Sequence, residues 1–249
     1  MKKLIVLFLS LIITCSLSAQ QSFLSQQRNY SRVRQAIAEK EEIITEKLRQ
    51  HGLTANNVHI LITAFKTEKQ LEVYAKKNTE TTYQLIATYN ICASSGELGP
   101  KCRQGDGQVP EGFYHIDRFN PSSSFHLSLG VNYPNQADRK RSNAKDLGGD
   151  IFIHGSCVTI GCLPMTNDKI KEIYLYAVYA KNNEQQNIPV YIFPFRMTNI
   201  NFEIYTKLHE NNQEIINFWK NLKTGYDKFF SEMKALNVGV DNNNGEYSF

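Results

Sequence analysis

The spacing of apolar residues changes along the chain from a helical pattern to a strand pattern. Residues 26–50 carry apolar side chains at steps of four and seven among Arg, Glu and Lys, which predicts an amphipathic helix packed on the rest of the domain. Residues 58–62, 71–75 and 83–89 instead alternate apolar with other side chains. Short polar connections separate these runs, so they predict three strands of an antiparallel meander.

The middle of the chain predicts further strands around one long loop. Residues 94–110 hold four glycines and two prolines, and loops of this length in compact domains tend to be functional or disordered. Residues 111–116 and 124–129 have strand patterns, and residues 151–153 form a short apolar run. Together these segments predict a sheet whose connections carry most of the polar residues.

The C-terminal part predicts helices around one more strand. A helix capped by Asn167 or Asp168 precedes a strand at 189–193. Apolar and aromatic residues at 212–236 have helical spacing on both sides of Gly225, which favours two helices with a break at this glycine. Residues 241–249 are polar and rich in Asn, and we expect them to be frayed.

These elements predict a mixed α+β fold with a β-sandwich or sheet core and flanking N- and C-terminal helices. We expect a helical segment at residues 20–54, a catalytic domain at 55–197 and a helical extension at 198–249. A length of 249 residues suits this arrangement. The formal charge of +4 includes Lys2 and Lys3, and so small an excess implies no nucleic-acid partner.

Residues 1–19 have a basic start, a short apolar run and a small-residue end, which predicts a cleaved secretory signal peptide and a location in the periplasm or cell envelope. The apolar run is shorter than the ~20 residues that cross a bilayer. Cys15 leaves lipidation open as an alternative, although Thr14 stands where a smaller residue is usual. A membrane partner is expected only if Cys15 is lipidated.

The candidate catalytic residues lie in residues 150–167. The apolar run 151–153 delivers His154 to a strand end, and Cys162 follows eight residues later. Thiol catalysis needs a sulfur that can become a thiolate, an imidazole that takes its proton and backbone N–H groups that face an oxyanion. Gly155 and Gly161 allow sharp turns and a close approach of the backbone to a substrate.

The sequence His154-Gly155 followed by Thr159-Ile160-Gly161-Cys162 resembles the active-site signature of the YkuD-type L,D-transpeptidases. The longer run HGSCVTIGCLPMTN resembles the YafK-like branch of this family, and the similarity extends over residues 57–230. The resemblance implies that Cys162 is the nucleophile and His154 its base, with Gly161 and Thr159 near the oxyanion. It also implies that peptidoglycan stem peptides are the substrate. No cofactor is expected, and a metal site of His115, His126 and His154 is disfavoured because the sequence lacks the closely spaced ligands of zinc sites.

Substrate contacts are expected from Gly155 and Ser156 and from three residues outside the motif. His126 is expected to line the cleft on the sheet face of His154. Lys101, like Arg103, is a candidate to meet a peptide carboxylate or is a solvated loop charge. Arg196 either holds substrate or pairs with an acid inside the domain.

The remaining cysteines allow one disulfide if Cys162 stays a thiol. Cys92 with Cys102 is the favoured pair, because it closes a short loop that contains Gly and Pro. Cys157 is expected to be a buried thiol, although oxidation with Cys162 is an alternative.

Three departures from the family pattern leave the reaction open. Leu163 and Pro164 follow the expected nucleophile where many members have an Arg nearby, and Ile160 stands where a second histidine is frequent. Many members also have a longer stretch between the histidine and the cysteine than the eight residues from His154 to Cys162. An L,D-transpeptidase is the leading hypothesis. The alternatives are an L,D-carboxypeptidase, an amidase that releases a protein from peptidoglycan, a silent peptidoglycan-binding module, and a secreted structural protein.

Overall fold

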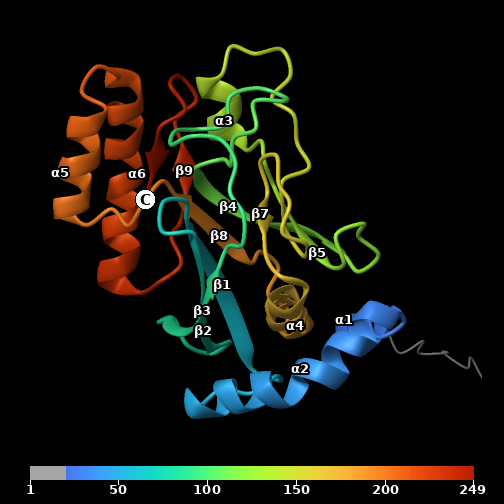
Figure 1. The fold of residues 1–249 in the computed structure, drawn as a ribbon. Helices are drawn as coiled ribbons and strands as arrows, with labels where there is room; N and C mark the ends of the chain where they lie inside the picture. Colours follow the sequence, from blue (N-terminus) through green and yellow to red (C-terminus); the bar gives the residue numbers. More distant parts are fainter. Residues whose placement is uncertain (1–20) are drawn as a thin grey trace, which may run out of the picture.

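A computed structural model describes residues 21–249, and the predicted signal peptide and Cys15 lie outside this range. Its main sheet has the strand order β3-β2-β1-β8-β4-β5-β6-β7 (Figure 1). The strands are β1 (Val58–Phe65), β2 (Gln70–Lys77), β3 (Gln84–Asn90), β4 (Gly112–Asn120), β5 (Ser128–Val131), β6 (Phe152–His154), β7 (Leu163–Pro164) and β8 (Pro189–Phe193). A hairpin of β9 (Gly239–Val240) and β10 (Tyr247–Ser248) forms a second, small sheet.

Helices lie on both sides of the main sheet. They are α1 (Phe23–Gln27), α2 (Ser31–Gln50), α3 (Gln136–Arg141), α4 (Asn167–Asn182), α5 (Asn199–Leu208) and α6 (Gln213–Glu232). Figure 1 shows α2 and α4 at one side of the strands and α5 and α6 at the other. The mixed α+β class, with a sheet core and flanking helices, is therefore confirmed.

The sheet is mixed, because β1 pairs with β8 and β7 pairs with β6 in the parallel direction. β1 runs antiparallel to β2 and β2 antiparallel to β3, as the meander pattern predicts. On its other edge β1 runs parallel to β8. β6 and β7 also run parallel, with Ile153 opposite Leu163 and His154 opposite Pro164. This short parallel pair carries the predicted catalytic segment.

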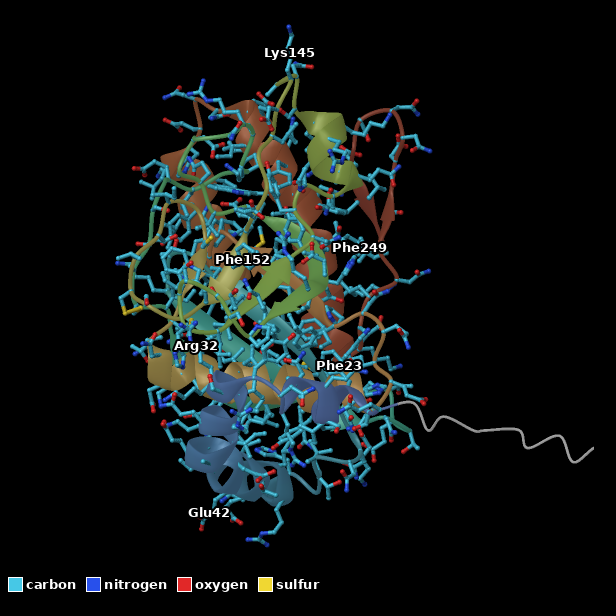
Figure 2. All side chains as sticks on the ribbon, turned by 90° about the vertical axis from the view of Figure 1, so that its right-hand side faces the viewer. Phe23, Arg32, Glu42, Lys145, Phe152 and Phe249 are labelled. Carbon is cyan, nitrogen blue, oxygen red and sulfur yellow. A yellow bond between two sulfur atoms is a disulfide. The ribbon has the colours of Figure 1, made fainter. Side chains whose placement is uncertain are left out.

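Alternate residues of β1 feed two separate cores. In β1, Ile60 and Ile62 join the core packed by α2 and α4, whereas Leu61 and Phe65 join the core packed by α6. Side chains fill the space between the strands and both helix layers (Figure 2). Trp219 of α6 is fully buried in the second core, so the C-terminal helix is part of the folded unit.

The prediction of two helices separated at Gly225 is wrong, because α6 runs through this position without a break. A Cβ on Gly225 would lie 2.4 Å from carbons of the Phe113 and Phe249 rings. The glycine therefore gives two aromatic rings room against the helix and does not end it. Residues 241–249 are not frayed either, because they hold β10 and the buried side chain of Tyr247.

The helix α5 was not predicted, and none of its residues is buried. Ile200, Ile204 and Leu208 are exposed on it. The cap of α4 also differs from the prediction. Thr166 is the N-cap and accepts a hydrogen bond from the Lys169 N–H, so Asn167 is the first helical residue. The limits of the three expected segments stay predictions.

Among residues 21–249, we find no helix with the length and apolar character of a membrane-spanning segment.

Candidate active site

The β6–β7 pair brings the segments of His154 and Cys162 together. The register pairs Ile153 with Leu163 and His154 with Pro164, and the side chains of Ile153 and Leu163 are buried in the core. Cys162 lies in the bend directly before β7, two residues from the strand partner of His154. The sulfur and the imidazole therefore come from adjacent segments, and their direct contact stays a prediction.

His154 is held as a neutral base. Its ring is almost completely buried, and Nδ1 lies 2.5 Å from Gly155 O. Because a carbonyl oxygen only accepts, Nδ1 carries the proton and Nε2 keeps the lone pair. Burial lowers the pKa of His154 below its usual value, against the opposing effect of the Gly155 hydrogen bond. The imidazole is therefore ready to take a proton through Nε2.

Phe125 forms one wall of the histidine site. Its ring centroid lies 4.7 Å from that of His154, and its side chain remains partly exposed. Sequence reasoning did not find this residue, because the pattern places it in a strand, whereas β5 begins only at Ser128. Nothing in the sequence around Phe125 indicates that its ring packs on His154.

Cys162 is a protonated thiol in this arrangement. Its Sγ donates to Asp150 O over 3.5 Å. Burial raises the pKa of the Cys162 thiol above its usual value, and the Phe152 N–H opposes this effect. A thiolate is therefore not preformed, and attack on a carbonyl requires the thiol to turn from Asp150 O toward the imidazole.

Thr159 organises the turn before the nucleophile. Its Oγ1 accepts the N–H of Gly161 at 3.2 Å and of Cys162 at 2.8 Å, and donates to Cys162 O at 3.0 Å. These two N–H groups were expected to face an oxyanion, but here they bind Thr159. Their oxyanion role stays a prediction, and it requires the Thr159 side chain to release them.

Two glycines and an asparagine fix the catalytic turn. Gly161 has φ +135°, and a Cβ there would lie 2.9 Å from Gln108 O. A Cβ on Gly155 would lie 2.6 Å from Asn167 Oδ1. Asn167 also accepts the Ser156 N–H at 2.9 Å, and Ser156 has a left-handed backbone with φ 68°. Asn167 was expected only as a helix cap, and its position after the true cap leaves its side chain available for this turn.

The disulfide prediction is wrong, because the bond joins Cys92 to Cys157 with a Cα–Cα distance of 5.4 Å. Cys102 is a free, exposed cysteine, and Cys157 is neither a buried thiol nor bonded to Cys162. The Cys92 N–H donates to Pro164 O, which brings Cys92 to β7 and to the turn that precedes it. The bond therefore ties the chain after β3 to the catalytic turn.

The three expected substrate residues outside the motif lie in other surroundings. Lys101 is buried, and its Nζ pairs with Asp106 at 2.5 Å. Arg196 Nη2 pairs with Glu72 Oε1 at 2.5 Å, so it is bound to an acid inside the domain. Neither residue lines the cavity that reaches Cys162, and their contact with substrate stays a prediction.

His126 lies near charged residues of α2 and α4. Its Nε2 is buried without a hydrogen-bond partner among the described residues, and burial lowers its pKa, with further lowering by Lys171 and Arg32. Its backbone is left-handed, with φ 70°, and its carbonyl accepts a hydrogen bond from Arg32 over 2.6 Å. It does not line the cavity at Cys162.

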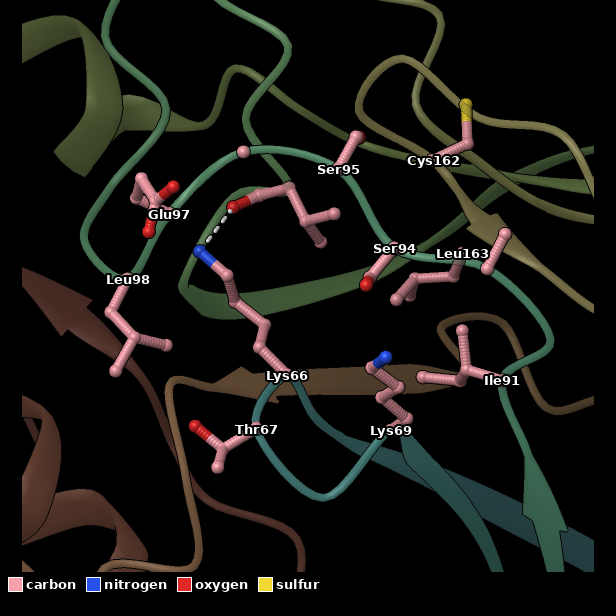
Figure 3. Close-up of a pocket in the computed structure, with 13 residues that line it drawn as sticks. Lys66, Thr67, Lys69, Ile91, Ser94, Ser95, Glu97, Leu98, Cys162 and Leu163 are labelled. Atoms are coloured by element: carbon pink, nitrogen blue, oxygen red, sulfur yellow. Dashed lines mark hydrogen bonds between the residues drawn. The ribbon is translucent and has the colours of Figure 1, made fainter.

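A cavity of about 130 Å³ opens beside the nucleophile (Figure 3). Cys162 and Leu163 form one edge, and the β1–β2 turn and residues 93–98 form the walls. Residues 21–249 contain no cluster of three His, Cys, Asp or Glu side chains that could hold a metal ion.

Comparisons with known proteins identify the family of this chain. Residues 59–192 match the family model YkuD, the L,D-transpeptidase catalytic domain. The chain is 40% identical over 185 residues to "Putative L,D-transpeptidase YafK" of Escherichia coli strain K12, covering 74% of this chain and 71% of that protein. The protein of the same name from Escherichia coli O157:H7 gives the same values.

Solved structures also match. The helical cell shape determining protein Pgp2 from Campylobacter jejuni covers 75% of this chain and 74% of its own, with 16% identity and a TM-score of 0.44. Bdellovibrio bacteriovorus Bd1075 covers 57% of this chain and 50% of its own, with 24% identity and a TM-score of 0.39.

The family match includes the strands of the main sheet and both predicted catalytic residues. The resemblance of the 154–167 segment to YkuD-type proteins and their YafK-like branch is thereby confirmed. The chain belongs to the YkuD family of L,D-transpeptidase catalytic domains.

Proposed function

We propose that this protein is a peptidoglycan-modifying enzyme that transfers an acyl group of a stem peptide through a thioester at Cys162. The observation that supports the proposal is the β6–β7 pairing, which brings the segments of His154 and Cys162 together, with Cys162 in the lining of a cavity. Membership of the YkuD family supports peptidoglycan as the substrate.

In the proposed reaction, His154 Nε2 takes the proton of the Cys162 thiol as sulfur attacks an amide carbonyl. A C–S bond forms, the amide C–N bond breaks, and the imidazolium returns the proton to the leaving amine. The Gly155 carbonyl holds the ring in the required tautomer throughout. An incoming amine then displaces the thiolate to make a cross-link, or water releases the acyl group.

The proposal includes action outside the cytoplasm, in the periplasm or cell envelope. The Cys92–Cys157 bond supports this location, because disulfides persist in oxidising compartments and are rare in the cytosol. The leader that would direct export lies outside the described residues. Peptidoglycan stem peptides, and a protein linked to them, are the proposed partners.

The test is mass spectrometry of muropeptides after incubation with the wild-type protein, Cys162→Ala and Cys102→Ala. Cys102 is the matched control, because it is the other free cysteine among the described residues. Cross-linked dimers identify a transpeptidase, loss of the terminal residue a carboxypeptidase, and release of a linked protein an amidase. Cys102→Ala should give the wild-type products and Cys162→Ala none. Identical products from the wild type and Cys162→Ala would reject the thiol mechanism.

A further inference from the structure

A cavity of about 420 Å³ lies at the start of α2, against the turn that follows β4. Its lining contains two arginines and no acidic residue, and is formed by residues 29–32 and 34, Pro121 and Ser122. Arg32 and Arg34 leave α2 on different sides, and both guanidiniums extend past the start of the helix. Figure 2 shows Arg32 above α2, on the side toward Phe152. No residue of this cavity also lines the cavity at Cys162.

Both arginines keep one edge of the guanidinium free. Arg32 uses only Nη1, which donates to the carbonyls of Ser123 and His126. Arg34 also uses only Nη1, which donates to the carbonyls of residues 28 and 29 at 2.9 and 2.8 Å. Within residues 21–249, Nε and Nη2 of both side chains have no hydrogen-bond partner. These two nitrogens form the side-on edge of the planar group, which binds an oxyanion through two parallel hydrogen bonds.

The positive charge of this region is not neutralised. The partners of both guanidiniums are carbonyl oxygens, and neither arginine forms an ion pair in the described part of the chain. Residues 21–38 contain three arginines and no acidic residue, and Glu39, the next acidic residue, pairs with Lys171. Burial lowers the pKa of the neighbouring His126, and Lys171 and Arg32 lower it further. The cavity therefore attracts an anion.

The donors suit a phosphate monoester better than a carboxylate. Each free guanidinium edge supplies two N–H donors, and the hydroxyls of Ser31 and Ser122 line the same cavity without a partner among the described residues. A carboxylate has two oxygens, which a single guanidinium edge already satisfies. A phosphate monoester has three free oxygens and a charge of roughly −1.5 to −2 at pH 7. It can therefore bind both edges and a hydroxyl together.

The cavity has room for the group that carries the phosphate. Its volume of about 420 Å³ falls in the range of small-molecule sites. Tyr30 is 43% exposed, and its ring and Pro121 supply apolar surface beside the polar donors. A glycerol phosphate or a sugar phosphate is therefore of suitable size and polarity.

We propose that this cavity binds a phosphate monoester, with Arg32 and Arg34 as its charge partners and the hydroxyls of Ser31 and Ser122 as further donors. The proposal does not depend on the reaction at Cys162, because the two cavities share no residue. Two sources present the same group: a soluble phosphate ester, and a lipid whose headgroup ends in a phosphate. A lipid would hold the start of α2 against a membrane surface, whereas a soluble ester would be a small ligand of the folded chain.

The soluble source is tested by phosphorus NMR titrations with glycerol phosphate. The protein begins at residue 21, because residues 21–249 contain both cores of the fold. Arg34→Gln removes a charge and a free edge, whereas Arg34→Lys keeps the charge and removes the edge. Arg139→Gln is the matched control, because Arg139 is an exposed arginine of α3 outside this cavity. Urea unfolding of each variant checks that it remains folded.

Glycerol phosphate should bind the wild type, and Arg34→Gln should weaken this binding about 10-fold. Arg34→Lys should recover only part of the loss, because an ammonium lacks the paired donors of the edge. Arg32→Lys, which can still donate to its carbonyl partners, should weaken binding for the same reason. Arg139→Gln should bind as the wild type does. Glycerate, which has a carboxylate in place of the phosphate, should compete about 10-fold more weakly than inorganic phosphate.

The lipid source is tested by sedimentation with vesicles of phosphatidylcholine, with and without phosphatidic acid. If the phosphate belongs to a lipid, the wild type should sediment with the vesicles that contain phosphatidic acid, and Arg34→Gln should lose most of this binding. If the source is soluble, the wild type and Arg34→Gln should sediment equally little, while they still differ in their binding of glycerol phosphate.

The proposal is overturned if neither probe binds, or if Arg34→Gln binds both probes as the wild type does. It is also overturned if Arg139→Gln weakens binding as much as Arg34→Gln, because the effect then depends only on net charge. Competition by glycerate that equals that of inorganic phosphate would overturn the choice of a phosphate. None of these assays measures acyl transfer, so their results are independent of the products formed at Cys162.

Discussion

Removal of the Cys92–Cys157 bond should destabilise the protein and disturb its catalytic turn together. The change is the double substitution Cys92→Ser and Cys157→Ser, which leaves no unpaired thiol behind. The cysteines are 65 residues apart, and the loop-closure relation for a loop of this length gives about 4 kcal/mol at 25 °C. The free energy of unfolding should fall by roughly 2 to 4 kcal/mol, because engineered and native bonds often deliver less than this relation gives.

The assay is urea unfolding of the wild type and the double variant, each with and without reductant. Reductant should lower the stability of the wild type to that of the variant and leave the variant unchanged. Cys102→Ser is the control, since this exposed cysteine makes no disulfide, and it should unfold as the wild type does. The bond also holds the turn before Cys162, so the double variant should lose kcat/KM at temperatures where it remains folded.

The reasoning is refuted if the double variant and the reduced wild type are as stable as the oxidised wild type. A peptide map that pairs Cys92 with Cys102 would also refute it, and would restore the shorter loop that the sequence favours. Under either result, the catalytic turn would need a different anchor than the one at Cys157.

Three further results are expected. Burial raises the pKa of Cys162 and lowers that of His154. Alkylation of Cys162 by iodoacetamide should therefore have its pH midpoint above that of free cysteine, and activity should fall on the acid side below the usual histidine pKa. An alkylation midpoint below that of free cysteine would contradict a neutral thiol and a neutral imidazole. Glu111→Ala leaves the buried Lys66 ammonium without its carboxylate, so urea unfolding should show a loss of about 3 to 5 kcal/mol, and an unchanged stability would disprove the importance of this pair. Burial raises the pKa of Asp138 to about 6, so the folded state binds this proton more tightly than the unfolded state. The stability that this group contributes is full below about pH 4 and declines as the pH rises to about 6. The difference in unfolding free energy between the wild type and Asp138→Asn should therefore change by roughly 2 to 3 kcal/mol across this interval, and a difference that does not depend on pH would contradict the raised pKa.

The direction of the Asp138 shift follows from burial, because its hydrogen bonds act in the opposite sense. The Asn135 N–H donates to Asp138 Oδ2 at 2.9 Å, and the Tyr114 hydroxyl donates to Asp138 Oδ1 at 3.0 Å. Both hydrogen bonds favour the ionised carboxylate, so they limit the rise in pKa that burial causes.

The strands of the meander could be predicted because each has one period along its whole length. β1 and β2 alternate, and their buried residues follow that alternation into two cores, whereas the buried apolar residues of β3 all join one core. α5 could not be found in the same way, since its aliphatic residues Ile200, Ile204 and Leu208 face solvent. A helix without buried residues gives no sequence signal of a core-facing stripe.

The proximity of the segments that hold His154 and Cys162 could be predicted because it is local in the sequence. Eight residues separate His154 from Cys162, and a parallel pair of short strands brings their segments together. The disulfide could not be predicted in this way, because proximity in the sequence favours Cys102 as the partner of Cys92. In the fold, the Cys102 N–H and O bind Asp106 and Ser142, whereas Cys92 is drawn to β7 by its bond to Pro164 O.

The site also depends on residues that the family match does not include. Arg32 of α2 lies outside the matched range 59–192, yet its guanidinium binds the carbonyls of Ser123 and His126. Phe125, which packs on His154, lies between those two carbonyls in the chain. Arg32 thus binds the backbone on both sides of the residue whose ring packs on His154. The N-terminal helix therefore supports the surroundings of His154, the proposed base, in addition to covering the core.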